Sequence, residues 1–199
     1  MNRPHRIFRL RTGRVSVLLL ALFASCSLVA KARGGVPQVA IAQDVGVPLP
    51  ADPFPPGKGV VEVDLGGTLL NLHFYKPDSY RADRFILLFH GASRTASGYR
   101  DSASGMGDAF GSLVVVPEFD LERFPSRLYQ YGGVFREDGS VADAEERTYA
   151  FVPMIVEYIR AREGDTRLPY LIVGFSAGGQ FVGRMAAFLD TDAERIVAI

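Results

Sequence analysis

The sequence contains very little cysteine, with Cys26 the single example in 199 residues. One cysteine excludes a disulfide framework within the chain, so folding must depend on an apolar core. Acidic residues are absent before Asp44, whereas five arginines lie in the first fourteen residues. Without the first 32 residues, sixteen basic residues would face twenty-two acidic ones. Nucleic acid is therefore not an expected partner, because binding phosphates requires a basic surface.

Long hydrophobic runs are also missing, since the longest, VSVLLLALFA, is shorter than the ~20 apolar residues of a membrane span. This run follows the basic N-terminus and precedes small residues, which predicts a secretory signal peptide over residues 1–32, cleaved after Ala32. The protein is then exported to the periplasm or the extracellular space. FASC, ending at Cys26, offers an alternative, because it resembles a bacterial lipoprotein box and would leave a lipid anchor in the membrane.

Residues 33–58 hold six prolines and no sustained periodicity, which predicts a linker or an extended lead-in. We expect one folded domain over residues 59–199. Its first segments, GVVEVDL and TLLNLHFYKP, flank the two-residue turn Gly66-Gly67, a pattern typical of a β-hairpin. His73 lies in the second segment, where we expect a half-buried strand residue rather than a catalytic one.

Beyond residue 84, continuous apolar runs alternate with helix-like stretches. RFILLFHG, SLVVVPEFD, YLIVGFSAGG and RIVAI are too uniformly apolar for strands with one wet face, which predicts parallel strands covered on both faces. Helices are expected within residues 95–110, from about Asp143 to Glu163, and from Ala177 to Leu189. The middle helix opens with Asp143 and Glu146 in capping-box spacing, and Pro153 should kink or break it. This alternation predicts an α/β domain.

Ser176 lies in the sequence Gly174-Phe175-Ser176-Ala177-Gly178, a G-x-S-x-G pattern between an apolar strand and a helix. In this context the pattern holds a nucleophilic serine on a tight strand-to-helix turn. Gly174 and Gly178 lack the Cβ atoms that would clash where strand and helix approach. The hydroxyl would lie at the helix N-terminus, whose partial positive charge favours an oxyanion. We therefore expect a nucleophile rather than a polar residue in a glycine-rich turn.

A second segment, LLFHGASRTASGY at residues 87–99, ends an apolar strand at His90-Gly91. Together with the G-x-S-x-G-G elbow, this H-G loop resembles the α/β-hydrolase superfamily over roughly residues 59–199. It is most similar to the exported esterase and polyester-depolymerase branch, where an H-G-x-x loop, an apolar strand ending in proline and the elbow occur in this order. The resemblance implies a mostly parallel sheet with helices on both faces and an N-terminal antiparallel hairpin.

The resemblance also implies roles for residues at both turns. Ser176 would attack carboxylic esters, and the backbone N–H groups of Ala92 and Ala177 would hold the oxyanion. The residues that would shape the two turns are His90, Gly91, Gly174 and Gly178. Other residues would lie near the same strand ends, either beside the substrate or at the surface: Arg94, Tyr99, Pro117 and Glu118. Glu118 is more simply explained as a solvated loop residue.

The catalytic acid and the histidine do not follow the nucleophile as they do in this superfamily. All three histidines precede the elbow: His5, His73 and His90. Asp192 and Glu194 come before the final strand, which makes both of them poor candidates for the acid. One interpretation, which we favour, is a sequence truncated before its C-terminal part, inactive or weakly active as this chain alone. The other is a non-catalytic exported or lipid-anchored binding protein that retains the fold.

The sequence holds no metal-ligand cluster, G-x-G-x-x-G loop or phosphate cradle, so we expect neither a metal nor a cofactor. The expected partner is a small-molecule or polymeric ester substrate. Peptidases and acyltransferases share the elbow, so the pattern does not distinguish these reaction types.

Overall fold

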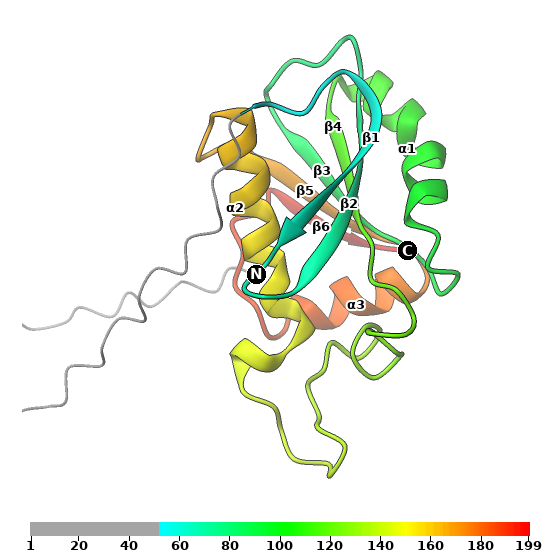
Figure 1. The fold of residues 1–199 in the computed structure, drawn as a ribbon, viewed down its shortest axis with the longest axis vertical. Coiled ribbons are helices and arrows are strands. Elements are labelled where there is room, and N and C mark those ends of the chain that lie inside the picture. Colours follow the sequence, from blue (N-terminus) through cyan, green and yellow to red (C-terminus); the bar gives the residue numbers. More distant parts are fainter. Residues whose placement is uncertain (1–51) are drawn as a thin grey trace, which may run out of the picture. The chain divides into compact units, whose positions relative to one another are not determined.

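The computed structural model describes residues 52–199, within which six strands form one sheet in the order β1-β2-β4-β3-β5-β6 (Figure 1). The strands are β1 (Gly57–Asp64), β2 (Leu69–Lys76), β3 (Phe85–Phe89), β4 (Leu113–Pro117), β5 (Tyr170–Gly174) and β6 (Arg195–Ala198). The helices are α1 (Ala96–Phe110), α2 (Phe151–Glu163) and α3 (Ala177–Met185), with the short 3-10 turns η1 (Ala144–Glu146) and η2 (Thr148–Ala150). The α/β architecture predicted from the sequence is confirmed.

Several sequence predictions fall outside the described residues. They are the signal peptide over residues 1–32, its cleavage after Ala32, the lipoprotein alternative at Cys26, and the linker up to residue 51. Within residues 52–199, no helix combines the length and the apolar character that crossing a membrane requires.

The predicted hairpin is confirmed, with β1 antiparallel to β2 from the pair Gly57↔Lys76 to the pair Asp64↔Leu69. Gly66 and Gly67 have φ angles of 67° and 89°, the left-handed backbone that a two-residue hairpin turn requires at both positions. β1 begins at Gly57, inside the segment predicted to be linker. β2 then pairs antiparallel with β4, and the remaining neighbours in the sheet are parallel.

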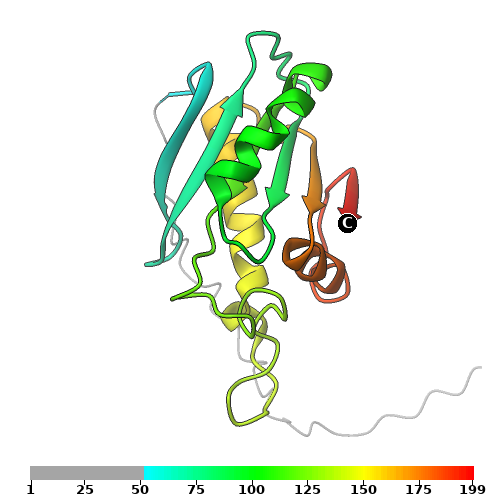
Figure 2. The ribbon, with the colours of Figure 1, turned by 90° about the vertical axis from the view of Figure 1, so that its right-hand side faces the viewer.

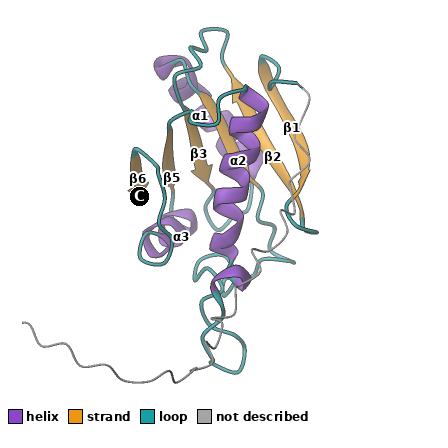
Figure 3. Cartoon of the chain, turned by 90° about the vertical axis from the view of Figure 1, so that its left-hand side faces the viewer, coloured by secondary structure: helices purple, strands orange, loops and turns teal. Residues whose placement is uncertain are grey.

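The helices lie on both faces of the sheet. Figure 2 shows α1 in front of the strands, and Figure 3 shows α2 on the opposite face, where α3 also packs. Every side chain of β3 and β4 is buried, as the apolar runs predicted. The prediction of complete burial is wrong for β5 and β6. On the α1 face of the sheet, Leu171 and Val173 of β5 pack against the cluster that includes α1 but are only partly buried, and β6 is exposed at both of its ends. That face and α1 border an apolar hollow of 630 Å³.

The helix expected from Asp143 begins later, at Phe151. The Glu146 carboxylate accepts a hydrogen bond from the Asp143 backbone N–H at 3.1 Å, but this contact closes the 3-10 turn η1 rather than α2. Pro153 is consequently the third residue of α2. A backbone N–H at that position has no acceptor within α2, so proline costs no hydrogen bond there. The expectation of a break at Pro153 is wrong, because α2 runs without interruption from Phe151 to Glu163.

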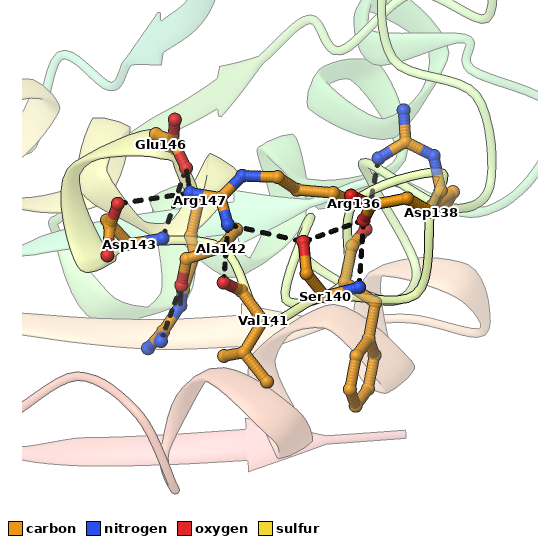
Figure 4. A network of polar contacts seen from close by, with 10 residues as sticks. Arg136, Asp138, Ser140, Val141, Ala142, Asp143, Glu146 and Arg147 are labelled. Atoms are coloured by element: carbon orange, nitrogen blue, oxygen red, sulfur yellow. Dashed lines mark hydrogen bonds and ion pairs between the residues drawn. The ribbon is translucent and has the colours of Figure 1, made fainter.

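Residues 118–150 form a long connection between β4 and α2, and its outer part is held together by polar contacts of its own (Figure 4). Arg136 forms ion pairs with Asp143, at 3.0 Å, and with Glu146. The Ser140 hydroxyl and backbone N–H both donate to Asp138, at 2.6 and 2.9 Å. This outer part therefore closes on itself, whereas the inner part, near residues 119–131, packs against the carboxyl edge of the sheet.

Candidate active site

Ser176 lies between the end of β5 and the first residue of α3, as the motif predicts. Its backbone has φ 55° and ψ −112°, a strained conformation for a residue other than glycine. The strain is held by hydrogen bonds on both sides, from the Ser176 N–H to the Ile199 carbonyl at 2.7 Å and from the Gln180 N–H to the Ser176 carbonyl at 2.9 Å. The residue remains exposed at the N-terminus of α3.

Two glycines make this short turn possible. A Cβ atom on Gly174 would overlap the Gly178 carbonyl, and one on Gly178 would overlap the Phe89 carbonyl. Backbone atoms cannot move aside as a flexible side chain can, so any larger residue would force the strand and the helix apart. These two glycines therefore permit the close approach of strand and helix, as the sequence predicts.

The H-G loop lies beside the elbow because β3 and β5 are parallel neighbours, with Phe89 opposite Gly174. A Cβ atom on Gly91 would lie 3.6 Å from the Ser176 Cβ. Ala92 follows at the exposed surface of this loop. Within the described part of the chain, neither the Ala92 N–H nor the Ala177 N–H has a hydrogen-bond acceptor. Two free backbone donors thus belong to the two turns that meet at Ser176.

His90 is fully buried directly beneath this loop, and both of its ring nitrogens are engaged. Nδ1 lies 3.0 Å from the Gly91 carbonyl, to which it donates, and Nε2 accepts from the Phe119 N–H at 3.1 Å. This pairing requires the neutral imidazole with its proton on Nδ1. Burial lowers the pKa of His90 to about 4, so the ring stays neutral at physiological pH. His90 shapes the loop and has no lone pair free for a proton from Ser176.

Tyr129, which no motif in the sequence marks, supports His90 from the β4–α2 connection. Its hydroxyl donates to the His90 carbonyl at 2.7 Å, and its ring lies 4.9 Å from the imidazole. The same ring stacks on Phe119 and on Phe181 of α3, with centroids 5.3 Å apart in both cases. No local pattern could have revealed this residue, because it meets His90 across 39 positions of sequence.

The other rim candidates lie on two sides of the elbow. Tyr99 of α1 packs near Phe175, with ring centroids 6.0 Å apart, and its hydroxyl occupies the space above Gly91. Glu118 is held by β2 rather than solvated, because its carboxylate contacts His73 Nε2 and accepts from Asn71 Nδ2, each at 3.0 Å. Pro117, just before it, is the last residue of β4.

The two acidic residues before β6 lie in ion pairs with other elements. Asp192 is 2.9 Å from Arg160 of α2, and Glu194 is 3.4 Å from Arg84, which precedes β3. Across residues 52–199, no group of three or more His, Cys, Asp or Glu side chains is placed to hold a metal ion.

Several solved structures are similar to this chain. No protein-family model matches the sequence, and no curated protein is significantly similar to it. The structure of poly(aspartic acid) hydrolase-1 from Sphingomonas sp. KT-1 is 35% identical over 73% of this chain and 56% of its own, with a TM-score of 0.67. The poly(3-hydroxybutyrate) depolymerase from Bordetella parapertussis is 29% identical over 68% of this chain and 48% of its own, with a TM-score of 0.63. The chain belongs to the α/β-hydrolase superfamily.

The chain spans about half the length of these two α/β-hydrolase structures, 56% and 48% respectively. A cold-adapted esterase from an Arctic intertidal metagenomic library, 17% identical over 70% of this chain and 59% of its own, shares the fold at a TM-score of 0.50. The described part of this α/β-hydrolase chain contains the serine elbow and the H-G loop, which lie side by side at the ends of β5 and β3.

Proposed function

We propose that this chain carries the nucleophile of a serine hydrolase that cleaves carboxylic esters through an acyl-enzyme on Ser176. The observation that carries the proposal is the strained backbone of Ser176 at the start of α3, held by hydrogen bonds and by two glycines that admit no side chain. Strain of this kind in a residue other than glycine is a feature of functional sites. The strained turn exposes the hydroxyl at a helix N-terminus.

In the proposed reaction, Ser176 Oγ attacks the ester carbonyl carbon while its proton passes to a base. The Ala92 and Ala177 N–H groups, which lack acceptors within residues 52–199, donate to the oxyanion of the tetrahedral intermediate. Collapse of the intermediate expels the alcohol and leaves an ester on Ser176, and attack by water then releases the acid. Serine needs an adjacent base to react at neutral pH. We expect this chain alone to be nearly inactive, because the two histidines of residues 52–199 are engaged elsewhere, His90 through both ring nitrogens and His73 with Glu118.

The proposed substrate class is supported by the two polymer-degrading enzymes that this chain resembles. One is a hydrolase of poly(aspartic acid) and the other a depolymerase of poly(3-hydroxybutyrate). Both of these polymers are joined by repeated carbonyl linkages. We infer a small or polymeric substrate of this kind, met outside the cytoplasm. Export through a signal peptide over residues 1–32, or anchoring by a lipid on Cys26, belongs to the same proposal.

A second candidate is an exported binding protein that keeps the fold without the chemistry. It is favoured by the state of the described histidines, since both nitrogens of His90 are engaged and His73 is paired with Glu118. Such a protein would bind an ester or acid at the same edge without forming a covalent bond to Ser176.

Labelling with a fluorophosphonate separates these two functions. The full chain is incubated with the probe, with and without about 100 mM imidazole as an external base. The labelled residue is then located by mass spectrometry. A serine hydrolase gives label on Ser176 that imidazole accelerates, and none in the Ser176→Ala variant. Ser102→Ala, at another exposed serine, should leave labelling unchanged. A Ser176 that stays unlabelled with imidazole present would instead favour the binding protein.

A further inference from the structure

Arg94 lies in the H-G loop, two residues beyond Ala92, in a backbone conformation that arginine rarely adopts. Its φ of 58° is in the left-handed region. Hydrogen bonds hold it there, from the Arg94 N–H to the Gly91 carbonyl at 3.2 Å and from the Ala96 N–H to the Arg94 carbonyl at 3.1 Å. Strained residues that their surroundings fix in this way occur at functional sites. Gly91 borders Ser176, so the loop holds Arg94 at the same edge of the sheet.

The Arg94 side chain is fixed as well as its backbone. The guanidinium lies over the Tyr129 ring, 4.3 Å from its centroid, and Nη1 donates to the Phe119 carbonyl at 2.8 Å. Tyr129 in turn contacts His90, which directly precedes Gly91. A positive charge is therefore placed by a tyrosine ring and a backbone carbonyl beside the loop that borders the nucleophile.

No described carboxylate neutralises this charge. Asp120, whose field acts on Arg94, is bound by Arg123, whose Nε and backbone N–H lie 2.6 and 2.8 Å from its two oxygens. The Arg94 Nε is buried and has no hydrogen-bond partner among residues 52–199. Of the guanidinium donors, only Nη1 has an acceptor within this part of the chain.

Partial burial is unfavourable for a cation, and it lowers the pKa of Arg94. Arginine nevertheless stays protonated in proteins. Its planar fork matches a carboxylate in a bidentate pair, and a guanidinium already held in place loses less entropy on binding. Because Nε is buried, a carboxylate brought by a ligand would bind through Nη2 and the remaining N–H of Nη1.

We propose that Arg94 binds a carboxylate of the substrate beside the carbonyl that Ser176 attacks, so that the preferred substrates carry a negative charge near the scissile bond. The inference rests on the proposed function for the position of the reacting carbonyl. It names the substrate class more narrowly, as acidic esters or related acidic polymers rather than neutral polyesters.

Equilibrium binding tests this proposal without requiring turnover. The probes are tetra-aspartate and its neutral analogue tetra-asparagine, each labelled with rhodamine and followed by fluorescence anisotropy with the full chain. Because every residue of tetra-aspartate carries a carboxylate, one carboxylate can reach Arg94 whichever residue of the peptide lies beside Ser176. We expect the wild type to bind tetra-aspartate at least about tenfold more tightly than tetra-asparagine. Arg94→Gln should remove that preference while leaving tetra-asparagine binding unchanged.

Arg184 provides a matched control, because its guanidinium also lies over a tyrosine ring, Tyr131 at 4.9 Å, and donates to a backbone carbonyl, that of Gln130 at 3.1 Å. Arg184→Gln should keep the preference, as should Ser176→Ala. Arg94→Lys retains the charge without the planar fork, so it should keep a weakened preference, and it serves also if Arg94→Gln fails to fold.

A wild type that binds both peptides equally would overturn the inference, and so would an Arg94→Gln variant that keeps the preference for tetra-aspartate. Labelling of Ser176 without an Arg94-dependent preference contradicts this inference alone and leaves the hydrolase intact. An Arg94-dependent preference in a chain whose Ser176 never reacts supports the carboxylate site and contradicts the hydrolase.

Discussion

The two strand-to-helix turns at the carboxyl edge of the sheet are built on different principles. The β5–α3 turn consists of Phe175 and Ser176, and crowding of backbone against backbone determines its shape. The β3–α1 turn spans residues 90–95, and buried polar contacts of His90 with Phe119 and Tyr129 support it. The short turn positions one hydroxyl and leaves no room for a side chain at Gly174 or Gly178. The long turn presents a backbone amide and a cation, and it depends on side chains from a distant segment.

The largest effect is expected from a side chain placed in the short turn. In Gly178→Ala, the added Cβ overlaps the Phe89 carbonyl, which cannot yield without separating α3 from β3. We expect a loss of about 4 kcal/mol in the free energy of unfolding, at the upper end for a single substitution. Urea denaturation followed by circular dichroism measures it. A loss below ~1 kcal/mol would show that the short turn is not sterically determined.

The long turn should instead respond to pH, through His90. Its pKa in the folded protein, about 4, is lower than the ordinary value of 6.5, so the unfolded chain binds a proton first as the pH falls. The stabilisation is complete above pH 6.5 and is lost as the pH falls toward 4, by about 3 kcal/mol in all. The free energy of unfolding at pH 7.5 and pH 4.5 tests this.

His90→Gln provides the control, since glutamine does not titrate. The carboxylates of the chain titrate in both the wild type and the variant, so the difference between the two pH profiles isolates the contribution of His90. Parallel profiles would mean that burial does not hold this imidazole neutral.

A smaller loss is expected where the distant segment supports the long turn. Tyr129→Phe removes the donor to the buried His90 carbonyl, and we expect a destabilisation of about 1 kcal/mol. Tyr149→Phe is the matched control, because the Tyr149 hydroxyl is buried without a hydrogen-bond partner among residues 52–199. Its removal should cost nothing. Equal losses in thermal denaturation of the two variants would contradict a role for the Tyr129 hydrogen bond.

The smallest effect has the opposite sign and lies beyond both turns. Gly105 is in the middle of α1, and a Cβ atom there would meet nothing within 4 Å. Gly105→Ala should stabilise the protein by about 1 kcal/mol through helix propensity alone. An increased melting temperature, beside the decrease for Gly178→Ala, would sharpen the contrast between a glycine that packing requires and one that it does not.

The sequence predicted those features that short-range patterns encode. Alternation and Gly66-Gly67 predicted the hairpin, apolar runs predicted β3 and β4, and G-x-S-x-G predicted the conformation of Ser176. Each of these depends on residues within a few positions of one another. Pro153 misled because the pattern shows that a helix contains a proline without showing in which turn the proline lies.

The support of the long turn could not be predicted in the same way. Tyr129 reaches His90, and Arg94 reaches Phe119, across 39 and 25 positions of sequence. Such contacts depend on how the β4–α2 connection packs after the sheet has formed. The incomplete cover of β5 was missed for a related reason, because apolar composition indicates a tendency to be buried and does not specify what covers the strand.

The outer part of the β4–α2 connection, closed by the ion pairs of Arg136, has a practical consequence for engineering. The Phe135↔Val141 bridge and the hydrogen bond from the Ala142 N–H to the Val134 carbonyl, at 2.9 Å, bring the two ends of this excursion together. A foreign peptide grafted at Gly139 would thus begin and end at nearly the same point. The excursion is a natural attachment site for an epitope tag or a reporter, leaving the strands and both turns unchanged.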